Sequence, residues 1–133
     1  MNLHPQLQHD CHVLGALPLS AVLLLNDVRY PWVILVPQRD EVREWIDLNA
    51  ADRQQLLLES CRVQEALRDL YHPDKLNIGL LGNIVPQLHL HHIARFTTDP
   101  AWPGPVWGHS KAEGYAPDQL QQRSEELKAA LGL

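Results

Sequence analysis

The sequence predicts one compact domain that contains both strands and helices. Two apolar runs of strand length, residues 20–26 and 32–37, are joined by a short polar connection, which is typical of an antiparallel hairpin. Over residues 50–71 the apolar side chains recur with helical spacing, and Pro73 follows them. The chain has 133 residues, of which 45% are hydrophobic, so it is long enough to bury a substantial core.

The hairpin is predicted by its residue types. Residues 20–26 are almost continuously apolar, as expected of a strand that is buried on both faces. Residues 32–37 are rich in β-branched and aromatic side chains, and a proline ends them. Asparagine, aspartate and proline in the connection favour a turn. A shorter strand is expected over residues 11–14, after a polar and irregular stretch over residues 2–10.

The expected long helix has a start signal and an apolar stripe. Asn49 can cap it, and Asp52 stands three residues later, where a capping box has its acid. Seven side chains are expected to face the core: Leu56, Leu57, Leu58, Cys61, Val63, Leu67 and Leu70. Four are expected to face water: Arg53, Glu59, Arg62 and Asp69. A further strand is expected over residues 75–81.

The last third of the chain has a different character. Residues 97–117 contain four prolines, three glycines and two tryptophans without a clear period. Because exposed tryptophans are costly, we expect an ordered arm laid over the surface. A last helix is expected over residues 118–131, between Pro117 and Gly132. We therefore expect a single domain over 1–133, with its core at about 10–98 and a C-terminal arm and helix over 99–133.

Composition narrows the classes of partner. The net charge is −5 and no block of like charges exists, which argues against binding a long nucleic acid but allows a small phosphorylated ligand. The longest apolar run is too short to span a membrane, and the first residues lack the layout of a secretion signal. Two cysteines give no disulfide framework, so a cytoplasmic location is expected.

A fifth predicted strand carries the chemistry. Residues 88–96 lie between a Gly-Asn pair with a proline and a Thr-Thr-Asp-Pro run. Because side chains alternate along a strand, Gln87, His89 and His91 point to one face. His92 points to the opposite, core side, where we expect a hydrogen-bonded histidine.

Two imidazoles on one strand face suit three kinds of chemistry. They can bind a metal ion, act as general acid and base, or provide a nucleophile with a hydrogen-bond donor beside it. A metal site needs further ligands, and the candidates His4, His9, Cys11 and His12 match no zinc pattern, so we expect no metal or other cofactor. The residues alone do not choose between acid–base and nucleophilic catalysis.

Here the residues carry a resemblance to a known family. The stretch Gln-Leu-His-Leu-His-His-Ile at residues 87–93 resembles the His-φ-His-φ-His-φ-φ signature of the histidine triad (HIT) family, where φ is apolar. Residues 24–37 are similar to the family's first hairpin, and residues 82–85 to its Gly-Gln-Ser/Thr-Val stretch. The resemblance covers roughly residues 20–98. It implies an α+β fold: a five-stranded antiparallel sheet with a long helix after the first hairpin and a C-terminal helix, often paired as a homodimer.

The resemblance also implies an activity. Family members are nucleotide hydrolases or transferases that act at the α-phosphate through a nucleotidyl-histidine intermediate, so the candidate substrates are dinucleoside polyphosphates and nucleoside phosphoramidates. By position, His89 matches the nucleophile and His91 the histidine that hydrogen-bonds the phosphate. Asn83 matches a phosphate-contacting position, and Asn26 or Asp27 the residue near the ribose hydroxyls.

The sequence departs from the family pattern at the first triad position, where Gln87 replaces histidine. In the family the backbone carbonyl of this position typically holds the other ring nitrogen of the nucleophile, and glutamine keeps a carbonyl. Any proton transfer by an imidazole at this position is lost. The alternative hypothesis is therefore a nucleotide-binding module with weak or no catalysis.

Overall fold

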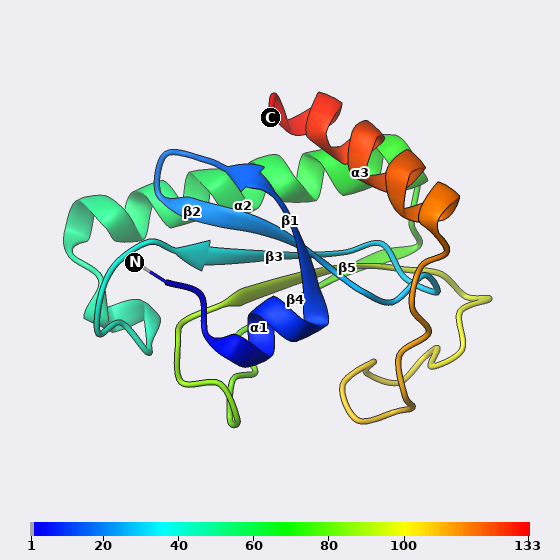
Figure 1. Ribbon diagram of the computed structural model, residues 1–133, viewed down its shortest axis with the longest axis horizontal. Coiled ribbons are helices and arrows are strands. Elements are labelled where there is room, and N and C mark those ends of the chain that lie inside the picture. The colour runs from blue at the N-terminus through cyan, green and yellow to red at the C-terminus, as the bar shows by residue number, and fades with distance from the viewer. Residues whose placement is uncertain (1) are drawn as a thin grey trace.

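The computed structural model describes residues 2–133 and shows an α+β fold built on one five-stranded antiparallel sheet (Figure 1). The strands are β1 (Cys11–Ala16), β2 (Ser20–Leu25), β3 (Trp32–Pro37), β4 (Lys75–Gly79) and β5 (Leu90–Arg95). The helices are α1 (Pro5–Asp10), α2 (Ala50–Tyr71) and α3 (Pro117–Leu131), with a short 3-10 helix η1 (Trp45–Asp47). The strand order is β1-β2-β3-β5-β4, so the histidine strand lies inside the sheet. The fold class predicted from the sequence is confirmed.

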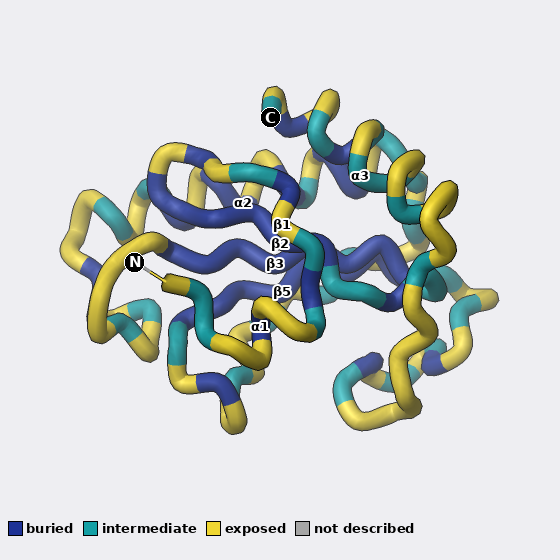
Figure 2. Tube along the Cα trace, in the orientation of Figure 1, coloured by how far each residue is buried: buried dark blue, intermediate teal, exposed yellow. Residues whose placement is uncertain are grey.

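Both faces of the sheet are covered. On one face α2 crosses the strands and α3 lies beside it (Figure 1). Val22, Val33 and Leu90 from the sheet pack there in one core with residues of both helices. On the other face, Leu23, Ile34 and Ile93 form a second core with α1 and the C-terminal arm. The central strands are accordingly buried along their length (Figure 2).

The register of the central strands brings the start of β3 next to the histidines. In the β3–β5 pair, Trp32 lies opposite Ile93 and Ile34 lies opposite His91. Residues two apart on a strand share a face, so Trp32 is a diagonal neighbour of His91. This register places an indole beside an imidazole.

Helix α2 begins as the sequence predicts but buries a different face. Asn49 caps it by accepting the N–H of Asp52 at 2.8 Å, whereas the Asp52 carboxylate binds Arg39. The prediction of core positions was wrong for four residues: Leu57, Leu58 and Cys61 are exposed, and Glu59 is buried. Helical geometry explains this outcome because Leu56, Val63 and Leu67 already define the buried stripe.

Other differences from the predicted elements are small. Residues 5–10 form α1 rather than irregular chain, β4 ends at Gly79, and β5 begins at Leu90, just after His89. Helix α3 starts with Pro117 and ends before Gly132, which has the left-handed conformation expected of a C-terminal glycine. Within residues 2–133, no helix is both long and apolar enough to cross a membrane.

Candidate functional site

The His89 imidazole is held in one orientation by the chain that precedes it. Its Nδ1 lies 2.7 Å from the backbone carbonyl oxygen of Gln87. A carbonyl oxygen can only accept a hydrogen bond, so Nδ1 carries the proton and Nε2 carries the lone pair. Among residues 2–133 no group forms a hydrogen bond with this Nε2. The neutral ring therefore presents an unprotonated nitrogen, which is the form that a nucleophile requires.

The His91 imidazole has the opposite proton arrangement. The indole Nε1–H of Trp32 lies 3.0 Å from its Nδ1, and an indole can only donate, so Nδ1 accepts. The proton of His91 is then on Nε2, which lies 3.2 Å from the carbonyl oxygen of Leu81. Burial, assisted by the nearby His89 ring, lowers the pKa of His91 to about 4. His91 is thus a neutral hydrogen-bond donor.

The two rings lie together on the sheet face opposite α2. Their centroids are 4.9 Å apart with the planes inclined by 68°. Trp107 from the C-terminal arm meets His91 edge-on at 5.4 Å, and both histidines are only 6% exposed. One unprotonated nitrogen and one N–H donor are therefore fixed side by side in a largely dry environment.

A polar cavity of about 170 Å³ opens in front of His89. Gly82 forms part of its wall, and a Cβ atom there would lie 2.9 Å from Cε1 of His89, so only glycine leaves room for the ring. Asn83 lies in the same wall and is exposed. The lining residues are Arg43, Glu44, Leu80, Gly82, Asn83, Val85, Gln87, Leu88 and His89.

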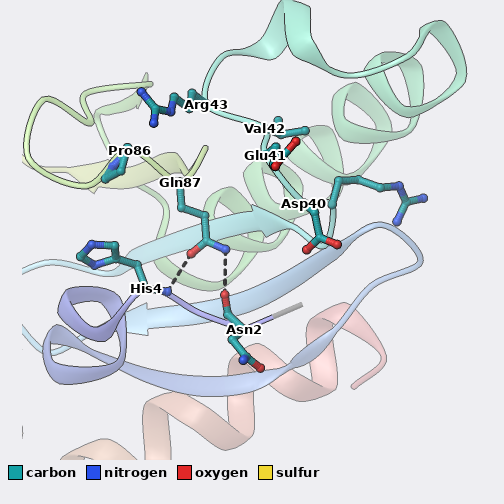
Figure 3. A pocket seen from close by; sticks show the side chains of 9 residues that line it. Asn2, His4, Asp40, Glu41, Val42, Arg43, Pro86 and Gln87 are labelled. Carbon is teal, nitrogen blue, oxygen red and sulfur yellow. Dashed lines mark hydrogen bonds between the residues drawn. The ribbon is translucent and has the colours of Figure 1, made fainter.

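The Gln87 side chain points toward the N-terminal segment (Figure 3). Its Oε1 accepts the backbone N–H of His4 at 2.8 Å, and its Nε2 donates to the carbonyl oxygen of Asn2 at 3.1 Å. A second cavity, of about 320 Å³, lies here, and Gln87 and Arg43 line both cavities. The backbone of Gln87 orients the imidazole, while its side chain binds the segment before α1.

A third cavity, of about 270 Å³, adjoins the site on the side of the C-terminal arm. Trp32, Leu81 and Trp107 line it, which connects it to the surroundings of His91. Asp27 also lines it, although this carboxylate is 2% exposed and binds the guanidinium of Arg29.

Asn26 has partners other than His89 and His91. Its Oδ1 accepts the backbone N–H of Tyr115 at 3.0 Å and lies 3.1 Å from Nε2 of His12. The predicted residues His89, His91, Gln87 and Asn83 therefore meet at one place, Asp27 lines the adjoining cavity, and Asn26 joins β1 to the arm.

His92 lies on the other side of the sheet, as alternation predicts. Its Nε2 accepts from the hydroxyl of Ser60 at 2.8 Å, and its Nδ1 lies 3.2 Å from the carbonyl oxygen of Val33. Burial lowers its pKa to about 4. His92 is a neutral, hydrogen-bonded core residue that joins β5 to α2.

The described residues, 2–133, hold no group of three or more histidine, cysteine, aspartate or glutamate side chains that could bind a metal ion. His4 lies beside Gln87, and His9 and His12 have other partners, Asp10 and Asn26.

Four residues of the site escaped the sequence analysis. Gly82 and Leu81 come before the histidines in the chain. The fold of their loop brings Gly82 next to the His89 ring and the Leu81 carbonyl next to the His91 ring. Trp32 reaches His91 through the β3–β5 register. Arg43, in the loop after β3, lines the cavity in front of His89. A buried tryptophan needs a partner for its N–H, and this is the signal that could have indicated a polar neighbour of Trp32.

Comparison with known proteins places this geometry in a family. The family model of the HIT domain matches residues 6–98. The chain is similar to the crystal structure of a histidine triad protein from Marinobacter aquaeolei VT8, with 46% identity and a TM-score of 0.96 over 98% of this chain and 96% of that chain. A histidine triad protein from Bradyrhizobium japonicum gives 45% identity and a TM-score of 0.96 over 98% and 97% of the two chains.

A third histidine triad protein, from Sinorhizobium meliloti 1021, has 42% identity and a TM-score of 0.95 over 98% of this chain and 96% of that chain. None of the curated proteins matches the chain. The family model covers more than two thirds of the sequence, and the similar structures share its whole fold. The chain therefore belongs to the histidine triad (HIT) family.

Proposed function

We propose that this protein is a nucleotidyl hydrolase or transferase that acts through His89. The observation that carries the proposal is the hydrogen bond from Nδ1–H of His89 to the Gln87 carbonyl oxygen, because it leaves Nε2 unprotonated beside an open polar cavity. Membership of the HIT family supports a nucleotide as the ligand.

The proposed reaction has two displacement steps. The Nε2 lone pair of His89 forms a bond to the α-phosphorus, and the bond from phosphorus to the leaving group breaks, with its electron pair going to the leaving group, which takes a proton from water. A water molecule then attacks the phosphorus and loses a proton to the solvent, the P–N bond breaks with its electron pair returning to Nε2 of His89, and the nucleoside monophosphate is released. The Nε2–H of His91 turns from the Leu81 carbonyl to a phosphate oxygen and stabilises the charge that develops there.

The cavities suggest how the substrate is divided. The cavity lined by Trp32, Leu81 and Trp107 has the aromatic and apolar walls that suit a nucleoside, with Asp27 near its ribose hydroxyls. Asn83 lies at the His89 cavity as a donor to the phosphate. The candidate substrates are dinucleoside polyphosphates and nucleoside phosphoramidates, and the activity needs no metal or other cofactor.

The first experiment incubates the purified protein, without added metal, with adenosine 5′-phosphoramidate and with diadenosine tetraphosphate. We expect AMP release and, in quenched samples, a trapped adenylylated protein in the intact mass spectrum. His89→Asn should abolish both while AMP binding is retained, and His72→Asn, at an exposed site away from the cavities, is the matched control. An active His89→Asn variant would contradict the mechanism.

The same experiment separates the proposal from a binding module without catalysis. The first triad position holds glutamine, so no imidazole there can move a proton. The Gln87 side chain instead binds the backbone of Asn2 and His4. Tight AMP binding with no release in the wild type would favour the binding module. Recovery of activity in Gln87→His would then assign the loss to this position.

We further propose that the protein forms a homodimer and works in the cytoplasm. Strand β4 is at the edge of the sheet, and Ile78 on it is 39% exposed. Leu57 and Cys61, both exposed, share a face of α2 with Gln64, which borders the same cavity as Ile78. The absence of a disulfide among residues 2–133 supports a reducing compartment. Sedimentation at several concentrations tests the dimer, and a monomer throughout would exclude it.

A further inference from the structure

The Trp32–His91 hydrogen bond has a consequence for the charge of the site. An indole N–H cannot accept a proton, so when Trp32 donates to Nδ1 of His91 that nitrogen has no place for a second hydrogen. Protonation of His91 would set two N–H groups against each other at 3.0 Å. The bond thus disfavours the imidazolium form through geometry, in addition to the effect of burial.

Among residues 2–133 no carboxylate acts on His91 to offset a positive charge, and the Leu81 carbonyl is the one group that favours it. Within residues 2–133, the titratable groups with an electrostatic effect on His91 are His89 and His92, and each would repel an imidazolium when it is itself protonated. The groups that face the ring from the neighbouring elements are Trp32 from β3, the Leu81 carbonyl from the loop after β4, and Trp107 from the arm. The carbonyl is the single acceptor among them, and it already binds Nε2–H.

A neutral His91 matters for the chemistry proposed at His89. When Nε2 of His89 bonds to phosphorus while Nδ1–H still binds the Gln87 carbonyl, the His89 ring becomes positively charged. A second positive ring with its centroid 4.9 Å away would oppose this intermediate. A neutral donor stabilises the phosphate without that repulsion.

We propose that Trp32 is a positioning residue: its indole N–H keeps His91 neutral, with the proton on Nε2 available to the phosphate. Trp32 lies outside the triad strand and, given the proposed function of His89, sets the pH range over which the site is active. This role also explains why an indole stands at the start of β3, where an apolar ring alone would fill the same space.

The test compares Trp32→Phe with Trp107→Phe. Both remove an indole that packs against His91, but only Trp32 donates a hydrogen bond to it. Nuclear magnetic resonance of ¹⁵N-labelled histidine follows the protonation of His91 against pH. We expect the pKa of His91 to rise from about 4 in Trp32→Phe, while burial still holds it below 6.5, and to move little in Trp107→Phe.

The pH profile of AMP release provides the second measurement. Relative to its own activity above about pH 8, Trp32→Phe should lose activity several-fold toward about pH 5, where His91 becomes charged, whereas the wild type should lose much less over the same range. Because His91 keeps Leu81 as an acceptor, the neutral ring in the variant still has its proton on Nε2. A merely structural role for Trp32 predicts a loss that is equal at all pH values, and that result would overturn the inference.

The outcomes remain separable from the proposed function. If the wild type shows no turnover, the titration of His91 still tests the hydrogen bond. If Trp32→Phe does not fold, the wild-type spectrum decides, because a His91 whose Nδ1 gains a proton near the ordinary pKa would overturn the inference. If Trp32→Phe shifts the titration of His91 but leaves the pH profile of AMP release unchanged, the inference is also overturned, because the charge of His91 would then not affect catalysis.

Discussion

At the scale of single residues, the free space beside the His89 ring is set by the absence of one methyl group. We expect Gly82→Ala to lower turnover by about tenfold or more, because the new Cβ would lie 2.9 Å from Cε1 of His89 and 3.1 Å from the Val85 carbonyl oxygen. Steady-state kinetics of AMP release measures the effect, and thermal unfolding shows whether the fold is retained.

The matched control is Ile84→Ala, two residues further along the same loop, where the side chain is 88% exposed. It should change neither turnover nor stability by much. Full activity in Gly82→Ala would show that the His89 ring can shift without cost, contrary to the steric argument.

Residue-scale prediction from the sequence succeeded where it depended on strand alternation. Period-2 geometry placed His89 and His91 on one face and His92 on the other, and the structure confirms this arrangement. Strand alternation did not reveal which nitrogen of each ring carries the proton. A carbonyl two residues away decides this for His89, and an indole 59 positions away in the chain decides it for His91. Such long-range hydrogen bonds depend on the register of β3 and β5.

At the scale of elements, a buried ion pair fastens the C-terminal arm to β5. Arg95 binds Asp99 at 2.8 Å with both side chains 2% exposed, and Asp99 also accepts the N–H groups of Phe96 and Trp102. Burial alone would raise the pKa of Asp99, but Arg95 and the two N–H groups lower it below its usual value. The charged carboxylate therefore organises the chain where the arm leaves the sheet.

We expect Asp99→Asn to reduce the free energy of unfolding by about 3–5 kcal/mol, because it leaves the guanidinium of Arg95 buried without a counter-charge. Urea denaturation measures the change. Arg39→Gln, which breaks the much more exposed pair with Asp52, should cost less than about 1 kcal/mol. Equal losses in the two variants would contradict the role given to burial.

Elements with strong local signals were predictable, and those that depend on tertiary contacts were not. The caps of α2 and α3 fixed their ends to within a residue. In contrast, α1 has six residues and few helix-forming signals, and it is held by the burial of Leu7 and by the Gln87 amide that binds His4. Leu57 and Leu58 were wrongly predicted to face the core, because hydrophobicity alone does not say which helix face is covered.

At the scale of the whole molecule, two neutral buried histidines make folding sensitive to mild acid. The pKa of His92 is about 4 in the folded protein and near 6.5 when the chain is unfolded, so the unfolded state binds more protons between these values. Stability is therefore full above about pH 6.5 and falls as the pH drops toward 4, by roughly 3 kcal/mol for His92 alone. His91 acts in the same direction.

We expect His92→Gln to flatten this pH dependence, because glutamine cannot take up the proton. Chemical denaturation of the wild type and the variant at neutral pH and at about pH 5 measures the difference. His72→Gln, at an exposed position, should retain the slope of the wild type. A wild-type stability that does not change over this range would contradict the burial of neutral His92.

The whole topology was predictable mainly through the family resemblance. Residue patterns indicated the hairpin, the long helix and the last helix, but pairing β5 between β3 and β4 requires contacts between residues far apart in the chain. Periodicity contains no information on such pairing, whereas the triad motif within an ordered series of elements does.

The tryptophans that contact His91 also provide a fluorescence signal at the site. Of the four tryptophans in the chain, Trp32 and Trp107 lie with their ring centroids 5.7 Å and 5.4 Å from that of His91, and both line the cavity proposed for the nucleoside. A ligand that enters there changes the solvent and the partners of both indoles. Intrinsic fluorescence should therefore report ligand binding on unlabelled protein, and substituting one indole at a time would show on which side of His91 the ligand lies.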